Sequence, residues 1–283
     1  MAYAREGGWL VMMKYLQNLH THSVFCDGKD TPEEMVQAAI GAGLTSLGFS
    51  PHAACWYSDY PLPENGTEDC FLEVERLKTV YSDRIELLQG FEFDCYCGVD
   101  VSRYDYVLGS LHNLYMDGVY IPFDRDIANM EKQIAEHFGG DGLAMAKRYY
   151  RELSDLPSYV NADIVAHFDT ITKLCEKKPF FDYTCKEYLD AAFEAIHALV
   201  PKIPVFEVNT GGMARGYRTA PYPTAPILKE LYRAGAHLTL SSDCHDKRFI
   251  THAFAETLAL IRDCGFGEVY TFTKQGFVSQ PLY

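Results

Sequence analysis

Six of the ten histidines in this chain sit in short motifs, and nearly all of those motifs close an apolar run of the kind that forms a β-strand. Imidazole nitrogens are common ligands of transition-metal ions, and carboxylates often complete such sites. Donors at the ends of successive strands are what a polynuclear metal site on a barrel rim requires. The pattern therefore predicts a metal-dependent hydrolase. The six histidines are His20, His22, His52, His112, His167 and His245.

Spacing supports the same interpretation near both ends of the chain. His20 and His22 are two apart at the end of a strand, where alternate side chains point the same way and can reach one ion. Asp243 and His245 repeat this spacing with an oxygen and a nitrogen donor. Asp27 lies five residues beyond His22 and is equally compatible with a plain turn. Alone, the first pair also fits surface histidines, but all of these patterns share one geometry.

A carboxylate also interrupts a strand that otherwise has the composition of a buried one. Glu92 lies within the apolar run 90–94. Burial of an ionised carboxylate is strongly unfavourable unless a cation pairs with it. We therefore predict that Glu92 is a metal ligand and a candidate for bridging two ions.

Composition and charge narrow the class of protein. Hydrophobic residues make up 48% and charged residues 23% of the 283 residues, which is ordinary for a globular protein with a sizeable core. A net charge of −14 argues against nucleic acid as a partner, and no apolar run is long enough for a membrane helix. An anionic substrate would need local cations at the site. Nine cysteines at irregular spacing indicate the reduced thiols of a cytoplasmic protein.

Apolar periodicity and turn residues predict alternating strands and helices along the chain. The expected strands span 15–19, 46–50, 85–93, 106–111, 163–166, 205–209 and 237–241, with a further strand at 269–272. The expected helices span 32–43, 69–81, 128–138, 143–153, 184–200, 225–233 and 251–264.

This alternation predicts an α/β protein with a parallel sheet and right-handed crossovers. Candidate ligands follow the first strand, the last strands and most strands between them. Only a closed ring brings both ends of the chain to one rim, so we expect a barrel rather than an open sheet. No linker or repeat divides the sequence. We expect an N-terminal extension at 1–14 and a single barrel domain at 15–283.

Taken in chain order, the motifs resemble those of the polymerase-and-histidinol-phosphatase (PHP) family of metallohydrolases, over about 15–273. The likeness is closest to the histidinol-phosphate phosphatase branch of that family. The motifs are His20-Thr21-His22, Ser50-Pro51-His52, Gly90-Phe91-Glu92, Ser110-Leu111-His112, Ala166-His167 and Ser242-Asp243-Cys244-His245.

The resemblance implies a distorted (β/α)7 barrel with a metal site at the C-terminal rim of the strands. It implies two to three divalent ions, and the mixed nitrogen and oxygen donors suit zinc, manganese or iron. The ligand sets that it implies are His20, His22, Glu92 and Asp243 for one ion, Asp27, His52 and His245 for a second, and His112 and His167 with a bridging Glu92 for a third.

Two arginines lie in the glycine-containing loop after the strand at 205–209. Enzymes similar to this chain place a phosphate-binding arginine in this loop, and a guanidinium group matches phosphate oxygens in a bidentate way. Arg215 and Arg218 are therefore both candidates, with solvated loop arginines as the alternative. A second segment, the loop at 53–69 that carries Tyr57 and Tyr60, is equally compatible with a lid over the site and with an ordinary surface loop.

By resemblance, the expected reaction is the hydrolysis of L-histidinol phosphate to L-histidinol and phosphate, a step of histidine biosynthesis. A metal-bridging hydroxide would attack phosphorus, and Asp243, His245 or a metal-bound water would protonate the leaving group. The sequence leaves the oligomeric state open. The alternatives are a PHP-type phosphoesterase acting on another small phosphate ester or a nucleotide, an amidohydrolase-type barrel, and a binding module without activity.

Overall fold

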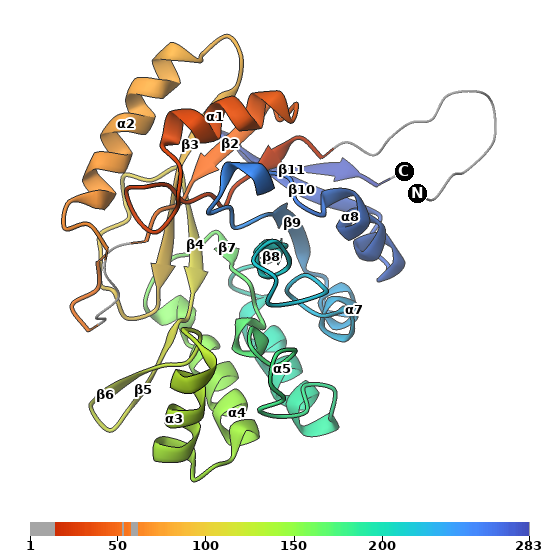
Figure 1. Cartoon of the computed structure of the whole chain (residues 1–283). Helices are drawn as coiled ribbons and strands as arrows, with labels where there is room; N and C mark the ends of the chain where they lie inside the picture. Colours follow the sequence, from red (N-terminus) through yellow and green to blue (C-terminus); the bar gives the residue numbers. More distant parts are fainter. Residues whose placement is uncertain (1–14, 53, 58–61, 283) are drawn as a thin grey trace.

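In the computed structural model, which describes residues 15–52, 54–57 and 62–282, seven parallel strands form the centre of the fold. The expected extension at 1–14 lies outside these residues. The strand order is β1-β2-β3-β4-β7-β8-β9, so every strand pairs with its neighbours in chain order (Figure 1). The strands are β1 (Gln17–Asn18), β2 (Ser46–Phe49), β3 (Glu86–Asp94), β4 (Tyr106–Ser110), β7 (Ile164–Val165), β8 (Val205–Asn209) and β9 (His237–Ser241).

The two edges of this sheet meet just beyond the ends of β1 and β9. His22 N donates to the carbonyl of Cys244 at 2.9 Å, and Cys244 N donates to the carbonyl of His20 at 3.0 Å. Nearby, Asn18 Nδ2 donates to Ser242 Oγ at 2.7 Å. These contacts nearly close the ring, which confirms the predicted (β/α)7 barrel.

Helices lie around the outside of the ring of strands (Figure 1). At the start of the first, Thr31 and Glu34 form the capping box predicted from the sequence, with Thr31 N donating to Glu34 Oε2 at 3.0 Å. Within the described residues, no helix is both long and apolar enough to cross a bilayer. The helices are α1 (Pro32–Gly41), α2 (Gly66–Val80), α3 (Ile127–Phe138), α4 (Gly142–Leu153), α5 (Lys186–Leu199), α6 (Gly211–Ala214), α7 (Ala225–Arg233) and α8 (Phe254–Asp263).

Several boundaries differ from the predicted ones for local reasons. The helix expected from residue 69 begins at Gly66, whose backbone packs so closely on the carbonyl of Phe25 that a side chain would not fit. The helix expected from residue 251 begins at Phe254, because Ala253 takes a left-handed conformation with φ 58° and cannot extend the helix backwards.

Two antiparallel hairpins accompany the barrel, and the sequence patterns did not reveal them as such. β5 (Asn113–Met116) and β6 (Val119–Pro122) join at Asp117-Gly118, where both φ angles are positive, as in the tight turns of two-residue hairpins. The strand predicted at 269–272 is real, but it pairs with β11 (Gly276–Pro281) as β10 (Glu268–Thr273). It lies outside the barrel ladder: β11 pairs with β10, and backbone groups of Tyr270 and Phe272 bond to the side chains of Tyr15 and Gln17 rather than to a barrel strand.

The side chain of Tyr106, from β4, packs against both β2 and β3 inside the barrel. The Tyr106 hydroxyl donates to the carbonyl of Leu19. A Cβ placed at Gly48 would lie 2.0 Å from that hydroxyl oxygen, and one at Gly90 would lie 2.2 Å from the ring carbon that bears it. Only glycine fits at these two positions, so the tyrosine fixes the spacing of the strands that lead to His52 and Glu92.

Gly90→Ala should lower the free energy of unfolding by about 1–3 kcal/mol, because the added methyl group overlaps the buried Tyr106 ring. Urea unfolding followed by circular dichroism measures this change. Gly41→Ala is the matched control, since its added methyl group meets open space at the end of α1 and should change stability by less than about 0.5 kcal/mol. Equal stability of the Gly90→Ala and parent proteins would contradict the steric argument.

Candidate metal centre

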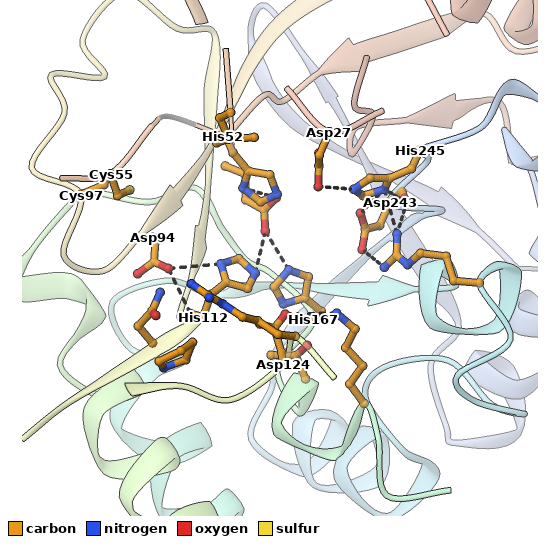
Figure 2. A pocket seen from close by; sticks show the side chains of 18 of the residues that line it. Asp27, His52, Cys55, Asp94, Cys97, His112, Asp124, His167, Asp243 and His245 are labelled. Atoms are coloured by element: carbon orange, nitrogen blue, oxygen red, sulfur yellow. Dashed lines mark hydrogen bonds and ion pairs between the residues drawn. The ribbon is translucent and has the colours of Figure 1, made fainter. Parts of the chain in front are cut away.

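All of the side chains predicted as metal ligands meet at the C-terminal ends of the barrel strands. Because parallel strands end on one rim, residues far apart in the sequence converge there. Seven of them line one pocket (Figure 2), and the other two, His20 and His22, are buried. The seven lining residues are Asp27, His52, Glu92, His112, His167, Asp243 and His245.

Glu92 lies at the centre of this cluster and is 3% exposed. Its two carboxylate oxygens contact imidazole nitrogens at 2.8–3.4 Å from histidines on four different strands. Burial alone raises the pKa of Glu92, but the surrounding imidazoles outweigh it and hold the pKa well below its usual range. Glu92 is therefore an ionised carboxylate placed between several nitrogen donors. The five histidines are His20, His22, His52, His112 and His167.

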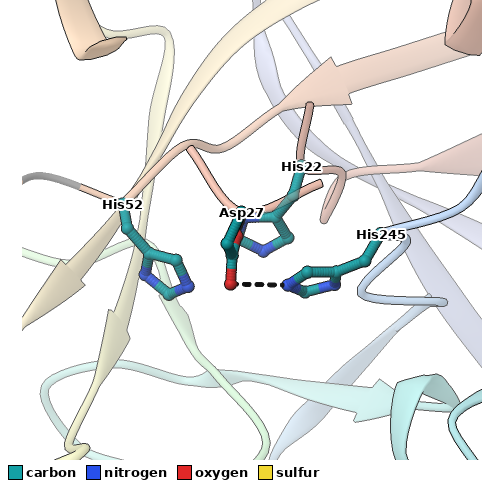
Figure 3. A group of neighbouring side chains, drawn as sticks. All are labelled: His22, Asp27, His52 and His245. Atoms are coloured by element: carbon teal, nitrogen blue, oxygen red, sulfur yellow. Dashed lines mark hydrogen bonds and ion pairs between the residues drawn. The ribbon is translucent and has the colours of Figure 1, made fainter. Parts of the chain in front are cut away.

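The donors fall into four overlapping sets whose ligand atoms lie within 4.8 Å of one another. In the largest set, Asp27 Oδ2 is 3.1 Å from His245 Nε2, and both face the rings of His22 and His52 (Figure 3). Shared members connect every set to the next. The sets are His22, Asp27, His52 and His245; His20, His22 and Asp243; His20, Glu92 and His167; and His52, Glu92 and His112.

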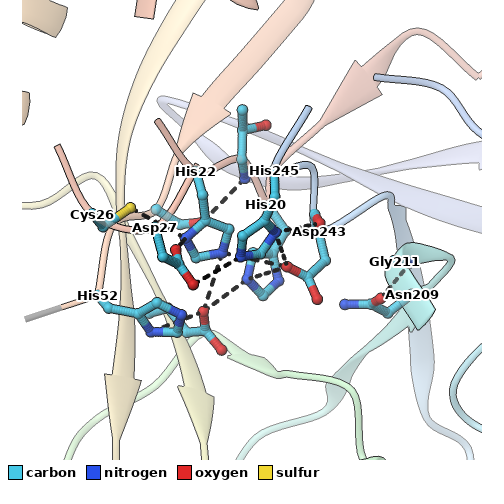
Figure 4. A network of polar contacts seen from close by, with 12 residues as sticks. His20, His22, Cys26, Asp27, His52, Asn209, Gly211, Asp243 and His245 are labelled. Carbon is cyan, nitrogen blue, oxygen red and sulfur yellow. Dashed lines mark hydrogen bonds and ion pairs between the residues drawn. The ribbon is translucent and has the colours of Figure 1, made fainter. Parts of the chain in front are cut away.

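The chemistry of the cluster fits divalent cations. His22 Nε2 is buried without a hydrogen-bond partner among the described residues, although it lies 3.4 Å from Asp243 Oδ1 (Figure 4). The same nitrogen lies 3.4 Å from Glu92 Oε2, so it faces two carboxylate oxygens, as the donors around a shared cation do. The His22 ring also stacks on His245 at 4.1 Å and on His52 at 4.6 Å, an arrangement that several protonated imidazoles would not tolerate.

Two of these histidines are held in the neutral form that binds metal. Burial lowers the pKa of His52 to about 4, against the opposing effect of Glu92 and Asp27. Burial and the neighbouring His22 also lower the pKa of His245. Neutral imidazole has a lone pair available for coordination near neutral pH.

A buried carboxylate that the sequence analysis did not single out as a site residue holds the cluster from behind. Glu207 Oε1 lies 2.7 Å from His20 Nδ1, and Glu207 Oε2 accepts from the backbone N of His167 at 2.7 Å and from Asn209 Nδ2 at 2.9 Å. Burial lowers the pKa of His20, but neighbouring carboxylates, Glu207 first, raise it to about 10. Glu207 thus keeps the Nδ1 proton in place and turns Nε2 toward Glu92.

The same signal that identified Glu92 could have identified Glu207. It is a charged residue in the middle of the apolar strand β8, and it is completely buried. Asp94 has a comparable place beside His112, with Oδ2 3.1 Å from the backbone N and 3.3 Å from Nδ1 of that histidine (Figure 2). Both carboxylates orient a candidate ligand rather than belong to the sets described above.

Asp243 is held in place by an unusual backbone conformation. Its φ is 45°, in the left-handed region that aspartate adopts more readily than most residues. A Cβ at Gly211 would lie 2.8 Å from the Cβ of Asp243, so glycine is required there for this close approach. The result is that the Asp243 carboxylate points back toward His20 and His22 from the end of β9 (Figure 4).

The two candidate arginines have different environments. Arg215 lines the pocket, where its guanidinium group donates to Asp243 Oδ2 at 2.8 Å and lies 2.8 Å from His245 Nδ1. Arg218 does not line the pocket and is 5% exposed. It contacts Thr172 Oγ1, lies 3.9 Å from Asp169 Oδ2 and stacks over Tyr222. Its guanidinium group is therefore buried under the loop, and of the two candidates that the sequence could not separate, Arg215 is the one that lines the pocket.

Other cations and part of the 53–69 loop complete the pocket. Lys29, Arg125 and Lys173 line it with Arg215, so four cationic side chains face the pocket beside its five carboxylates in a chain whose net charge is −14. From the loop, Tyr57 lines the pocket and stacks on Tyr120 of β6 at 4.3 Å. Residues 53 and 58–61, which include Tyr60, lie outside the described residues, and the proposed lid remains a prediction.

A seven-stranded α/β barrel whose strand ends converge on buried imidazoles and carboxylates defines a metal-dependent hydrolase. The family model described as PHP domain matches residues 18–211, which is more than half of the chain. This protein therefore belongs to the PHP domain family, as the motif resemblance predicted.

Individual relatives cover nearly the whole chain. A protein of Schizosaccharomyces pombe named "Probable histidinol-phosphatase" is 27% identical over 278 residues, covering 90% of this chain and 89% of its own. One of the same name from Deinococcus radiodurans is 25% identical, covering 92% and 97%. The crystal structure of histidinol phosphate phosphatase from Lactococcus lactis, complexed with zinc, L-histidinol and phosphate, has a TM-score of 0.69 at 19% identity, covering 93% and 98%, and shows the same fold.

Glu207→Gln should weaken metal binding by about 10- to 100-fold, because an amide cannot hold the Nδ1 proton of His20 and accept from His167 in the same way. Titration of the metal-stripped protein with zinc against a competing chelator measures the affinity. Glu230→Gln, on the outer helix α7, is the control and should bind zinc as the parent protein does. Unchanged affinity in Glu207→Gln would show that His20 is oriented by other groups.

Proposed function

We propose that this protein is a phosphomonoesterase that hydrolyses L-histidinol phosphate to L-histidinol and inorganic phosphate. The observation that carries the proposal is one pocket that combines overlapping sets of metal donors with a cationic side, as a dianionic phosphate ester requires. The relatives named as histidinol-phosphatases, similar over about nine-tenths of the chain, support this particular ester. The molecule that the protein binds is then a small-molecule substrate, which is consumed in a step of histidine biosynthesis. We place the protein in the cytoplasm, where its nine cysteines are kept as thiols.

We further propose that the pocket holds two to three divalent ions of zinc, manganese or iron. Mixed imidazole and carboxylate donors suit these metals better than magnesium. When bound, the ions supply Lewis acidity toward the phosphoryl group and the attacking water. The overlapping sets place Glu92 in contact with donors on two sides, which supports a bridging role for it.

Arg215 is the residue that we assign to the phosphoryl oxygens. Its guanidinium group is fixed at the pocket wall by Asp243 and His245. A guanidinium group that is already oriented offers parallel N–H donors to two oxygens and loses little freedom when phosphate arrives. Lys173, on the same pocket, adds positive charge and is itself positioned by Asp124 at 3.3 Å.

Asp243 is suited to proton transfer. Burial raises its pKa, but Arg215 and the adjacent histidines outweigh burial and hold the pKa well below its usual range. At neutral pH it is therefore a carboxylate, which gains a proton only transiently, from the attacking water. The protonated form can then return that proton to the leaving alkoxide, and His245, whose Nδ1 is 3.3 Å from Asp243 Oδ1, can take the same role.

The decisive experiment is phosphate release from L-histidinol phosphate by metal-reconstituted protein. We expect turnover at rates typical of biosynthetic enzymes and the loss of at least about 1,000-fold in His22→Ala, because that substitution removes a donor shared by two ligand sets. Metal content and circular dichroism of both proteins serve as controls. A folded, metal-loaded protein that releases no phosphate from this ester, but does so from other monoesters or short oligonucleotides, would contradict the proposed substrate.

Arg215→Ala should reduce kcat/KM by about 100-fold, since it removes a charge-assisted contact to the phosphoryl group. Arg233→Ala, at the exposed end of α7, is the control and should leave kcat/KM unchanged. Steady-state kinetics with the same ester measure both variants. If Arg215→Ala has the kinetics of the parent protein, another pocket cation must bind the phosphate.

A further inference from the structure

Two cysteine side chains face each other on the wall of the metal pocket. Cys55 lies shortly after β2 and Cys97 shortly after β3, and both line the pocket (Figure 2). The two thiols are close enough for each to shift the pKa of the other. The other seven cysteines do not line this pocket. Solutes that enter the pocket can therefore reach both of these neighbouring thiols.

The pair links two segments that carry parts of the candidate metal centre. Cys55 follows His52 by three residues, and Cys97 follows Asp94 by three residues. Asp94 in turn contacts the backbone N and the ring of His112. A covalent bond between the thiols would thus tie the segment that positions His52 to the segment that positions His112.

The hydrolysis proposed above does not use these thiols. Among the described residues, none of the sets of three or more ligand atoms contains Cys55 or Cys97. Both thiols lie beside the phosphate pocket, yet neither contacts the guanidinium group of Arg215 in any described interaction. Their contact with each other is the feature that remains to be explained.

The two thiols differ in acidity. The neighbouring thiol of Cys97 lowers the pKa of Cys55, against the opposing effect of burial. The neighbouring thiol of Cys55, together with burial, raises the pKa of Cys97. Cys55 is therefore the more easily ionised of the two thiols and the better initial nucleophile.

We propose that Cys55 and Cys97 are a thiol modification site, which reacts with low-molecular-weight disulfides to form an intramolecular disulfide and thereby lowers the hydrolytic activity reversibly. The Cys55 thiolate attacks one sulfur of the reagent and releases one reagent thiol. Cys97 then loses its proton and attacks Cys55 Sγ in the mixed disulfide, which releases the second reagent thiol. The protein loses two protons and two electrons, and the reagent gains them.

The disulfide lowers activity because it draws together the segments that follow β2 and β3. A disulfide allows only a narrow range of Cα separations, so the backbone must adjust where the native contact lies outside that range. A displacement of about 1 Å at a reacting group can reduce the rate by about 100-fold, and we expect a loss of about tenfold or more here. Reductant should restore the original rate.

The test treats the metal-loaded full chain with oxidised glutathione and maps disulfides by mass spectrometry of peptides. Activity toward L-histidinol phosphate is measured on the same samples before oxidation, after oxidation and after addition of dithiothreitol. For Cys55→Ser and Cys97→Ser, the activity of each variant after treatment is divided by its own activity before treatment. Any effect of the substitution itself on the reduced enzyme then cancels. Cys185→Ser, at the N-terminus of α5 and away from the pocket, is the matched control.

We expect a Cys55–Cys97 disulfide in the parent and Cys185→Ser proteins, with a reversible loss of activity in both and in neither of the two pocket variants. Absence of this disulfide when other thiols are glutathionylated would overturn the proposal. An equal loss in Cys55→Ser or Cys97→Ser would overturn it too, since the oxidation would then act through the metal or another thiol. The mapping does not depend on turnover, so failure of the proposed substrate would be recognised separately.

Discussion

The burial of one negative charge governs this structure. Glu92 is an ionised carboxylate in the middle of a barrel, and such a group is stable there only if positive charge or hydrogen-bond donors surround it. Five imidazoles supply the contacts, and each arrives from the end of a strand or the turn after it. The ring of parallel strands is the arrangement that allows so many separate segments to reach one carboxylate.

The groups behind the donors show how the site keeps its geometry. Glu207 orients His20 and the backbone of His167, and Asp94 orients His112. Arg215 donates a hydrogen bond to the Asp243 carboxylate and so holds it in place. A cluster of like-charged or mutually repelling groups would spread without these restraints, and with them the donors are already arranged before a ligand arrives.

The sequence predicted the barrel well because its signals are local. Each strand is a short apolar run, and a donor after it inherits the position of the strand end, as His52 and His167 illustrate. Tertiary contacts decided what the sequence left open. Arg215 and Arg218 are three residues apart in one loop, and only the packing of that loop on Tyr222 sends one to the pocket and buries the other. Glu207 has the same local signal as Glu92, a charge within an apolar strand, but its orienting role depends on contacts with His20 and His167 that only the folded chain shows.

The parallel bridge between the residues after β1 and those after β9 has a consequence for biosynthesis of the chain. Its two hydrogen bonds join Cys244 to His20 and His22, more than 220 residues earlier. Contacts of such long range form late in folding, since the intervening chain must first be ordered. On the ribosome, the histidines made first must therefore wait until the segment that carries Asp243 and His245 has emerged. Until then the candidate ligands near the first strand lack the partners that complete their sets.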